Sequence, residues 1–319
     1  MKARIAYVFP GQGSQVVGMG RAFAEALDEA RRIFETGEAV TGLPLARLCF
    51  EGPMEELTRT AHLQPALTAV EMAAAAAARA SGLVPAAAAG HSLGEYPALW
   101  AAGVLSTEDT FRLVHHRGRL MEEAGTRHPG AMAAVLGMDR SALEALMAPI
   151  AREGALTLAN HNSPEQIVAT GEAPLVKQLC EAVKAAGARA IPLKVSGAFH
   201  SPLMAEAAGA FAALLDQVEF RAPEVPVYLN VTAEPEQDPE AIRRHAKAQM
   251  VSPVRWYETV VRMRADGIDT FLEVGPKQVL SNLVRKSLPG EAVRVLQAED
   301  PDGLAEIRRA LGQGEGGPA

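Results

Sequence analysis

Short apolar runs alternate with helical patterns along the first third of the chain. Residues 5–9 form an apolar run that a Pro-Gly pair closes, which is the pattern of a buried strand that feeds a loop. An Ala-rich helix is predicted over residues 65–80, and its small side chains favour close packing against other elements. Residues 86–90 form a second apolar run, and the helix predicted after it ends near residue 102.

The last third of the chain continues this alternation. Two strands and two helices are predicted there, over residues 225–230 and 269–274 and over residues 239–250 and 253–265. Ser-Pro pairs that start at residues 201 and 252 are predicted to open helices, because Ser is a preferred N-cap and Pro suits the first helical position. Ser106, with an acidic residue three positions on, predicts the start of a helix that reaches residue 123. Strands that alternate with helices indicate a parallel sheet in the larger part of the protein.

The middle of the chain has a different pattern, in which strands and helices follow the order β-α-β-β-α-β. The predicted elements cover, in chain order, residues 132–136, 141–148, 156–159, 167–170, 174–186 and 189–193. This order is that of the ferredoxin-like fold. We therefore predict a small subdomain at residues 127–195, inserted into a core of residues 1–126 and 196–308. The Gly-rich end, residues 309–319, is predicted to be a flexible tail.

Composition and charge narrow the class of protein. A chain of 319 residues with 48% apolar and 22% charged residues can bury one large or two unequal domains and is not a disordered chain. The net charge of −7 gives no basic surface for nucleic acid. No apolar stretch approaches the roughly 20 residues of a membrane span, and the N-terminal apolar run is too short for a signal peptide. These features predict a cytoplasmic protein without nucleic-acid or membrane partners.

The two cysteines, Cys49 and Cys180, cannot build a disulfide framework. Neither belongs to a Cys-x-x-Cys pair or lies near a cluster of histidines in the sequence. We therefore predict no metal site, and we interpret both residues as small buried or half-buried thiols.

The clearest chemical motif is Gly90-His91-Ser92-Leu93-Gly94, a Gly-x-Ser-x-Gly sequence between a predicted strand and a predicted helix. This is the pattern of a nucleophile elbow, in which a strained turn projects the serine hydroxyl from the carboxyl end of the sheet. Glycines suit the close approach of strand and helix, and the N–H groups of the helix N-terminus favour a developing oxyanion. The alternative is a serine N-cap between two turn glycines.

A serine nucleophile needs a general base, and His200 is the histidine that we favour. It immediately precedes a predicted helix start, where the helix N-terminus disfavours an imidazolium and keeps the ring neutral. His91 adjoins the serine and is expected to point the other way. Of the acids between serine and base, Asp109 is better explained as a helix cap and Asp139 as a turn residue. A Ser–His dyad oriented by a neutral acceptor therefore stays open.

The Gly-rich loop around Gln12 follows the first predicted strand and lies at the same end of a parallel sheet as the elbow. A backbone N–H of this loop and the N–H of Leu93 would supply two oxyanion donors. A phosphate site is a rival hypothesis, although the loop lacks the third glycine of a dinucleotide fingerprint and the lysine of a P-loop. A plain structural turn is the other alternative.

Four motifs follow one another along the chain. They are Phe9-Pro10-Gly11-Gln12-Gly13-Ser14-Gln15, Gly90-His91-Ser92-Leu93-Gly94-Glu95-Tyr96, Ala198-Phe199-His200-Ser201 and Ser252-Pro253-Val254-Arg255-Trp256. Together, over about residues 3–290, they resemble the malonyl-CoA:acyl carrier protein transacylases, an acyltransferase family of fatty acid and polyketide synthesis. The resemblance implies an α/β fold, in which an α/β-hydrolase-like parallel-sheet core carries an inserted ferredoxin-like small subdomain.

The resemblance also implies catalytic roles for individual residues. Ser92 would be the nucleophile and His200 its base, while Gln12 and Leu93 would supply the oxyanion donors from their backbones. Gln249 matches the residue whose backbone carbonyl orients the histidine. No acid is then expected in the dyad.

Three further residues concern the substrate. Arg117 matches the arginine that pairs with the free carboxylate of a malonyl group. Asn162 matches a polar residue that lines the site from the small subdomain, with Asn160 as an alternative. Phe199 matches the malonyl-selecting form in polyketide acyltransferases, because a bulky ring leaves no room for an α-methyl group.

The implied activity is ping-pong transfer of a malonyl group from malonyl-CoA, through a malonyl-serine, to the phosphopantetheine thiol of acyl carrier protein in fatty acid biosynthesis. No cofactor is implied, and we expect a monomer. Three other hypotheses stay open: a serine esterase or thioesterase, a trans-acting polyketide acyltransferase, and a non-catalytic scaffold.

Overall fold

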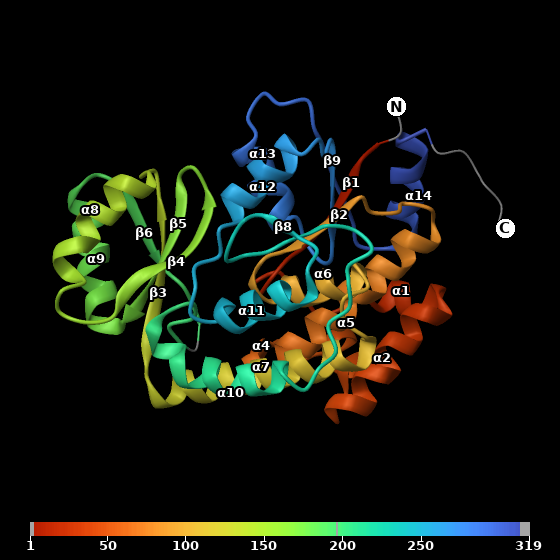
Figure 1. The fold of residues 1–319 in the computed structure, drawn as a ribbon, viewed down its shortest axis with the longest axis horizontal. Coiled ribbons are helices and arrows are strands. Elements are labelled where there is room, and N and C mark those ends of the chain that lie inside the picture. Colours follow the sequence, from red (N-terminus) through yellow and green to blue (C-terminus); the bar gives the residue numbers. More distant parts are fainter. Residues whose placement is uncertain (1–2, 196, 313–319) are drawn as a thin grey trace.

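Within residues 3–195 and 197–312, which the computed structural model describes, the chain folds around two β-sheets (Figure 1). The larger sheet has the strand order β10-β9-β1-β2-β7-β8. Its strands are β1 (Ile5–Phe9), β2 (Ala87–Gly90), β7 (Val227–Tyr228), β8 (Pro235–Glu236), β9 (Thr270–Val274) and β10 (Arg294–Ala298). The first five in this order are parallel, and the edge strand β8 runs antiparallel to β7. The predicted parallel sheet is confirmed.

Helices cover both faces of this sheet. They are α1 (Arg21–Ala26), α2 (Asp28–Thr41), α3 (Leu45–Phe50), α4 (Met54–Thr58), α5 (Thr60–Ala80), α6 (Glu95–Ala101), α7 (Thr107–Arg127), α10 (Ala205–Leu215), α11 (Pro239–Gln249), α12 (Trp256–Ala265), α13 (Val279–Ser287) and α14 (Pro301–Ala310). None of the helices in the described ranges is both long enough and apolar enough to cross a membrane.

The central strand β1 shows how the larger sheet is buried. All of its side chains are buried, as expected for a parallel strand that is covered on both faces. Tyr7 and Phe9 pack into the same apolar core as α5, whereas Ala6 and Val8 pack into a second core with α12 and α13. The Ala-rich sequence of α5 makes this packing close, because every residue from 63 to 78 is buried.

The smaller sheet lies beside the larger one (Figure 1). Its strands are β3 (Gly130–Leu136), β4 (Leu156–Ser163), β5 (Gln166–Glu172) and β6 (Arg189–Pro192), and its helices are α8 (Arg140–Ile150) and α9 (Ala173–Ala185). The strand order β4-β5-β3-β6 with antiparallel neighbours is that of the ferredoxin-like fold. The predicted fold class is thus confirmed, while the subdomain boundary at residues 127–195 stays a prediction.

One predicted helix starts later than the sequence suggested, and the difference matters for the site. The helix expected over residues 253–265 begins only at Trp256. Val254 instead runs beside β4, where its N–H donates to the carbonyl of Ala159 and its carbonyl accepts from the N–H of His161, at 2.8 and 2.9 Å. Long-range pairing therefore outcompetes the local Ser-Pro helix signal, and this contact joins the smaller sheet to the segment that precedes α12.

Smaller differences concern element ends. The strand predicted over residues 225–230 pairs only at Val227–Tyr228. Ser201 does cap a helical turn, but the turn is a short 3₁₀ segment, Pro202–Met204, that precedes α10. The helix α14 reaches Ala310, so the predicted tail is helical at its start. Residues 313–319 of that tail lie outside the described residues.

Candidate active site

The turn after β2 places Ser92 at the carboxyl end of the larger sheet. A 3₁₀ turn, Ser92–Gly94, leads directly into α6. The φ angle of Ser92 is +52°, in the left-handed region that costs a non-glycine residue free energy. A Cβ at Gly90 would lie 1.9 Å from the backbone of Gly94, and a Cβ at Gly94 would lie 2.1 Å from the carbonyl oxygen of Phe9. Both glycines are therefore required by space, as the elbow interpretation predicted.

Asn230 holds this strained turn and was not anticipated from the sequence. Its side-chain Oδ1 accepts from the N–H of Ser92 at 2.7 Å, and its Nδ2 donates to the carbonyl of Gly90 at 2.6 Å. One buried amide thus fixes the backbone on both sides of His91, where the turn begins. The available signal was its position just past a neighbouring strand, at the same edge of the sheet.

We expect Gly94→Ala to destabilise the protein strongly. The φ of Gly94 is −59°, which suits alanine, so the effect would come from the collision with the β1 backbone. The free energy of unfolding should fall by about 2–4 kcal/mol, measured by urea denaturation. The matched control is Gly209→Ala in α10, where the new Cβ meets nothing within 4 Å. That variant should gain about 0.5–1 kcal/mol. Similar stabilities for the two variants would contradict the steric account.

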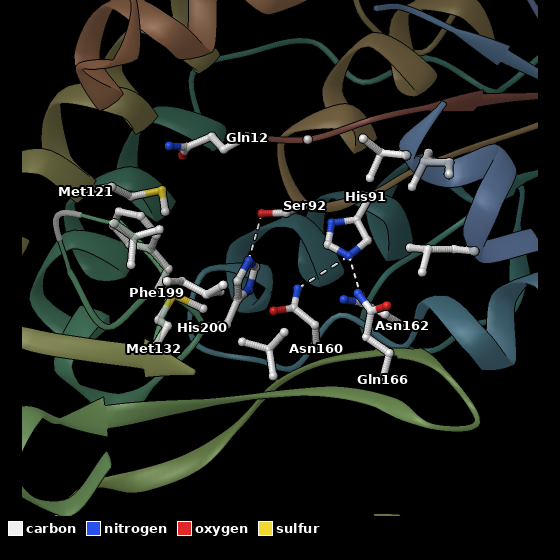
Figure 2. A pocket seen from close by; sticks show the side chains of 17 residues that line it. Gln12, His91, Ser92, Met121, Met132, Asn160, Asn162, Gln166, Phe199 and His200 are labelled. Atoms are coloured by element: carbon white, nitrogen blue, oxygen red, sulfur yellow. Dashed lines mark hydrogen bonds between the residues drawn. The ribbon is translucent and has the colours of Figure 1, made fainter. Parts of the chain in front are cut away.

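Ser92 and His200 form a hydrogen-bonded dyad. The Oγ of Ser92 lies 2.7 Å from Nε2 of His200 (Figure 2). The other ring nitrogen, Nδ1, lies 3.1 Å from the carbonyl oxygen of Gln249 and 2.9 Å from that of Ser252. Because carbonyls only accept, Nδ1 must carry the hydrogen, and the free lone pair of Nε2 faces the serine.

The environment of His200 keeps the ring neutral. Burial is the main cause, and the charge of Arg117 adds to it, so that the pKa of His200 falls to about 3. A neutral imidazole can accept a proton from the serine at physiological pH. The expectation for Gln249 is incomplete, since the carbonyl of Ser252 lies closer to the ring than that of Gln249.

The guanidinium of Arg117 lies beside Ser92. Arg117 is fully buried on α7, and its Nη2 is 3.2 Å from Oγ of Ser92. Two neutral amides hold it: Nη1 donates to Oε1 of Gln64, and Nη2 donates to Oε1 of Gln249, both at 3.0 Å. It also stacks over the ring of Tyr96 at 5.5 Å. Burial lowers the pKa of Arg117, and nearby Tyr96 and Glu95 act in the opposite direction.

Glu95 is a buried carboxylate that connects these groups. Its Oε1 accepts from Nε2 of Gln249 at 2.9 Å, and its Oε2 accepts from the N–H of Asn230 at 2.6 Å. The same Nε2 of Gln249 donates to the carbonyl of Ser92 at 3.0 Å. Burial raises the pKa of Glu95 to about 7, despite these donors and the charge of Arg117. Glu95 therefore positions the elbow and Gln249 without touching the dyad.

The raised pKa of Glu95 predicts how stability depends on pH. An acid whose pKa is higher in the folded state stabilises the protein below its usual pKa of 4.5 and loses that contribution as pH rises through 7. We therefore expect the wild type to lose about 3 kcal/mol relative to Glu95→Gln between pH 4 and pH 8. Denaturant unfolding of both proteins across this range measures the difference. Parallel curves would contradict the prediction.

A cavity of about 190 Å³ opens in front of the dyad. Figure 2 shows Met121, Met132 and Phe199 on one side of this cavity. The polar side chains of His91, Asn160, Asn162 and Gln166 lie on the other side. Asn162, Phe199 and Gln12, three of the candidate site residues, all line this cavity. The cavity lining does not include Arg117, although Nη2 of Arg117 lies 3.2 Å from Oγ of Ser92.

His91 does not point away as expected but lines the cavity. Its Nε2 lies 2.8 Å from Oδ1 of Asn162 and 3.4 Å from Nδ2 of Asn160. Burial lowers the pKa of His91, so the ring is neutral. The two asparagines that we held as alternatives therefore meet at the same ring.

Known proteins share both the sequence pattern and the fold. The family described as acyl transferase domain matches residues 6–305. The chain belongs to this acyl transferase family.

Named relatives of this acyl transferase point to one activity. The malonyl CoA-acyl carrier protein transacylase of Bacillus subtilis (strain 168) is 43% identical over 302 residues, which are 94% of this chain and 95% of that protein. The protein of the same name from Escherichia coli (strain K12) is 41% identical over 285 residues, 89% of this chain and 92% of that one. The acyl carrier protein S-malonyltransferase of Vibrio cholerae matches with a TM-score of 0.91 and 39% identity, over 96% of this chain and 100% of that one.

One solved relative is a complex. A type II polyketide acyl carrier protein with its malonyl-transacylase matches with a TM-score of 0.92 and 38% identity, over 97% of this chain and 100% of that one. The predicted family and enzyme class are therefore confirmed. Within the described ranges, no group of three or more histidine, cysteine or acidic side chains is placed to hold a metal ion.

Proposed function

We propose that the chain transfers the malonyl group of malonyl-CoA to the phosphopantetheine thiol of acyl carrier protein, in fatty acid biosynthesis. The observation that carries the proposal is the buried guanidinium of Arg117, 3.2 Å from the nucleophile. An acyl group on Ser92 that ends in a carboxylate can reach this cation, whereas an acetyl group leaves it unpaired. A hydrogen bond to a charged group contributes about 1.5–3 kcal/mol, so the site favours a dicarboxylic acyl group.

The first half of the reaction forms the acyl-enzyme. Nε2 of His200 takes the proton of Ser92 as Oγ attacks the thioester carbonyl carbon. The carbon–sulfur bond then breaks, and CoA leaves with the proton that His200 returns. The N–H of Leu93, in the first helical turn, and the N–H of Gln12 are the proposed donors to the oxyanion.

The second half of the reaction reverses these steps with a new thiol. The carrier thiol gives its proton to His200 and attacks the ester carbon, and Ser92 regains the proton as its oxygen leaves. The proposed positioning roles follow from contacts: the carbonyls of Gln249 and Ser252 orient His200. Phe199 narrows the cavity on the acyl side, and Asn162 faces the cavity from the small sheet.

Each step uses only groups of the chain and the thiols of its two substrates, so we propose that no cofactor takes part. Relatives named for malonyl-CoA and acyl carrier protein, and one solved complex with a carrier protein, support the two partners. The cytoplasmic location and the monomeric state stay predictions from the sequence.

Intact-mass spectrometry tests the proposal. The protein is mixed separately with malonyl-, methylmalonyl- and acetyl-CoA, and holo acyl carrier protein is then added. We expect a malonyl adduct that the carrier protein removes. Steady release of free CoA without an adduct would indicate a thioesterase instead. Equal adducts with all three donors would keep the nucleophile but contradict the role of Arg117.

A further inference from the structure

Gln64 is a buried amide on α5 that contacts the cation of the site but not the dyad. We propose that Gln64 is a positioning residue that determines acyl specificity: it holds the guanidinium of Arg117 through a neutral oxygen, which leaves the positive charge for the carboxylate of the substrate. This inference rests on the proposed malonyl transfer. It adds to that function a reason why the site prefers a charged acyl group.

The contacts of Gln64 fix which end of its amide faces which partner. Its Oε1 accepts from Nη1 of Arg117 at 3.0 Å. Its Nε2 donates to Sδ of Met121 at 3.3 Å and to Oε1 of Gln12 at 3.4 Å. The reverse orientation would set the NH₂ group against the guanidinium, donor against donor. Gln64 itself is fully buried, so no water replaces these contacts from bulk solvent.

The second terminal nitrogen of Arg117, Nη2, is also held by a neutral amide oxygen rather than by a carboxylate. Nη2 donates to the amide oxygen of Gln249, and the carboxylate of Glu95 connects to Arg117 through that amide. Neutral oxygens thus orient both ends of the guanidinium. A carboxylate in either position would orient it equally well but would also neutralise it.

The choice between an amide and a carboxylate has a consequence for selectivity. A buried cation without a direct counter-ion is costly, and a carboxylate brought in by the substrate removes that cost. An internal carboxylate would remove it in advance, so that malonyl and acetyl groups would bind alike. The link from Gln64 to Gln12 also ties the carboxylate-binding cation to the loop proposed to hold the oxyanion.

Two substitutions separate orientation from charge. Gln64→Glu keeps an oxygen acceptor for Arg117 and adds the counter-ion, whereas Gln64→Met keeps similar volume and removes all three side-chain hydrogen bonds of Gln64. The measurement is kcat/KM for acylation by malonyl-CoA and by acetyl-CoA, with thermal unfolding of each variant. Gln217→Glu, at an exposed position after α10, controls for the added charge.

We expect Gln64→Glu to lower the ratio of malonyl to acetyl kcat/KM by about 10- to 100-fold. Gln64→Met should lower it less, mainly by raising KM for malonyl-CoA, and Gln217→Glu should leave it unchanged. If Gln64→Glu fails to fold, the malonyl-to-acetyl ratio of kcat/KM in Gln64→Met tests the inference instead, and an unchanged ratio would overturn it. Equal losses for both donors in folded variants would overturn the inference and leave Gln64 as packing between α5 and α7. A wild type that forms no malonyl adduct would instead overturn the proposed function.

Discussion

Ser92→Ala should form no acyl-enzyme and should lower the rate of transfer to the carrier thiol by about 10⁴-fold or more. The reason is chemical, because the hydroxyl is the atom that His200 contacts at 2.7 Å and that would carry the acyl group. The fold should be retained, since Ser92 holds its position through backbone bonds to Asn230 and Gln249 that alanine keeps.

Intact mass and the release of CoA measure the effect. Ser81→Ala, at the end of α5, removes a serine hydroxyl that bonds only locally to the carbonyl of Ala78 and should act like the wild type. A malonyl adduct that persists in Ser92→Ala would place the nucleophile elsewhere and would reopen the role of the elbow.

Arg117→Ala is the second large effect that we expect, and its signature is a change in preference. Malonyl transfer should fall by about 100-fold or more, while acetyl transfer should fall far less. The reason is that only the malonyl group carries a carboxylate, which loses its partner when the guanidinium is removed. The substitution also leaves the amide oxygens of Gln64 and Gln249 without their donor, so some loss with both substrates is expected.

The matched control lies two residues further along the same helix. Arg119 is exposed, and its contact is a surface ion pair with Glu123 at 3.8 Å. Arg119→Ala should therefore change neither the preference for malonyl over acetyl nor the stability by much. The ratio of the two acylation rates is the deciding quantity. Equal losses for malonyl and acetyl in Arg117→Ala would show that the guanidinium only supports the structure.

Local patterns in the sequence predicted the parts of the fold that local physics determines. The apolar run at Ile5–Phe9, the Ser106 cap of α7 and the order of elements in the small sheet all appear in the structure. Ser106 accepts from the N–H of Asp109, as the spacing indicated. The elbow was also predictable, because Gly90 is demanded by a backbone contact with Gly94, within a few residues of the serine. The close contact of Gly94 is long-range, with the carbonyl oxygen of Phe9, but the Gly-x-Ser-x-Gly motif already marked that glycine.

Long-range contacts account for what the sequence did not predict. Val254 pairs with β4 rather than starting a helix, and Ser252 consequently presents its carbonyl to His200. Gln64 and Asn230 act through partners 53 and 138 positions away, at Arg117 and Ser92, and no local pattern marks them. The resemblance suggested a role for Arg117, and the structure adds that the neutral amides of Gln64 and Gln249 hold its guanidinium.

The acceptors that orient His200 are main-chain oxygens, those of Gln249 and Ser252. Every amino acid carries such a carbonyl, so no single codon change can delete either acceptor. A dyad oriented in this way is robust to point mutation at those two positions, provided the backbone keeps its path. A carboxylate in the same role would be lost through one nucleotide substitution. At positions 249 and 252, by contrast, the tolerance to mutation is set by what the side chains contact, because the carbonyl that orients His200 is present with any residue.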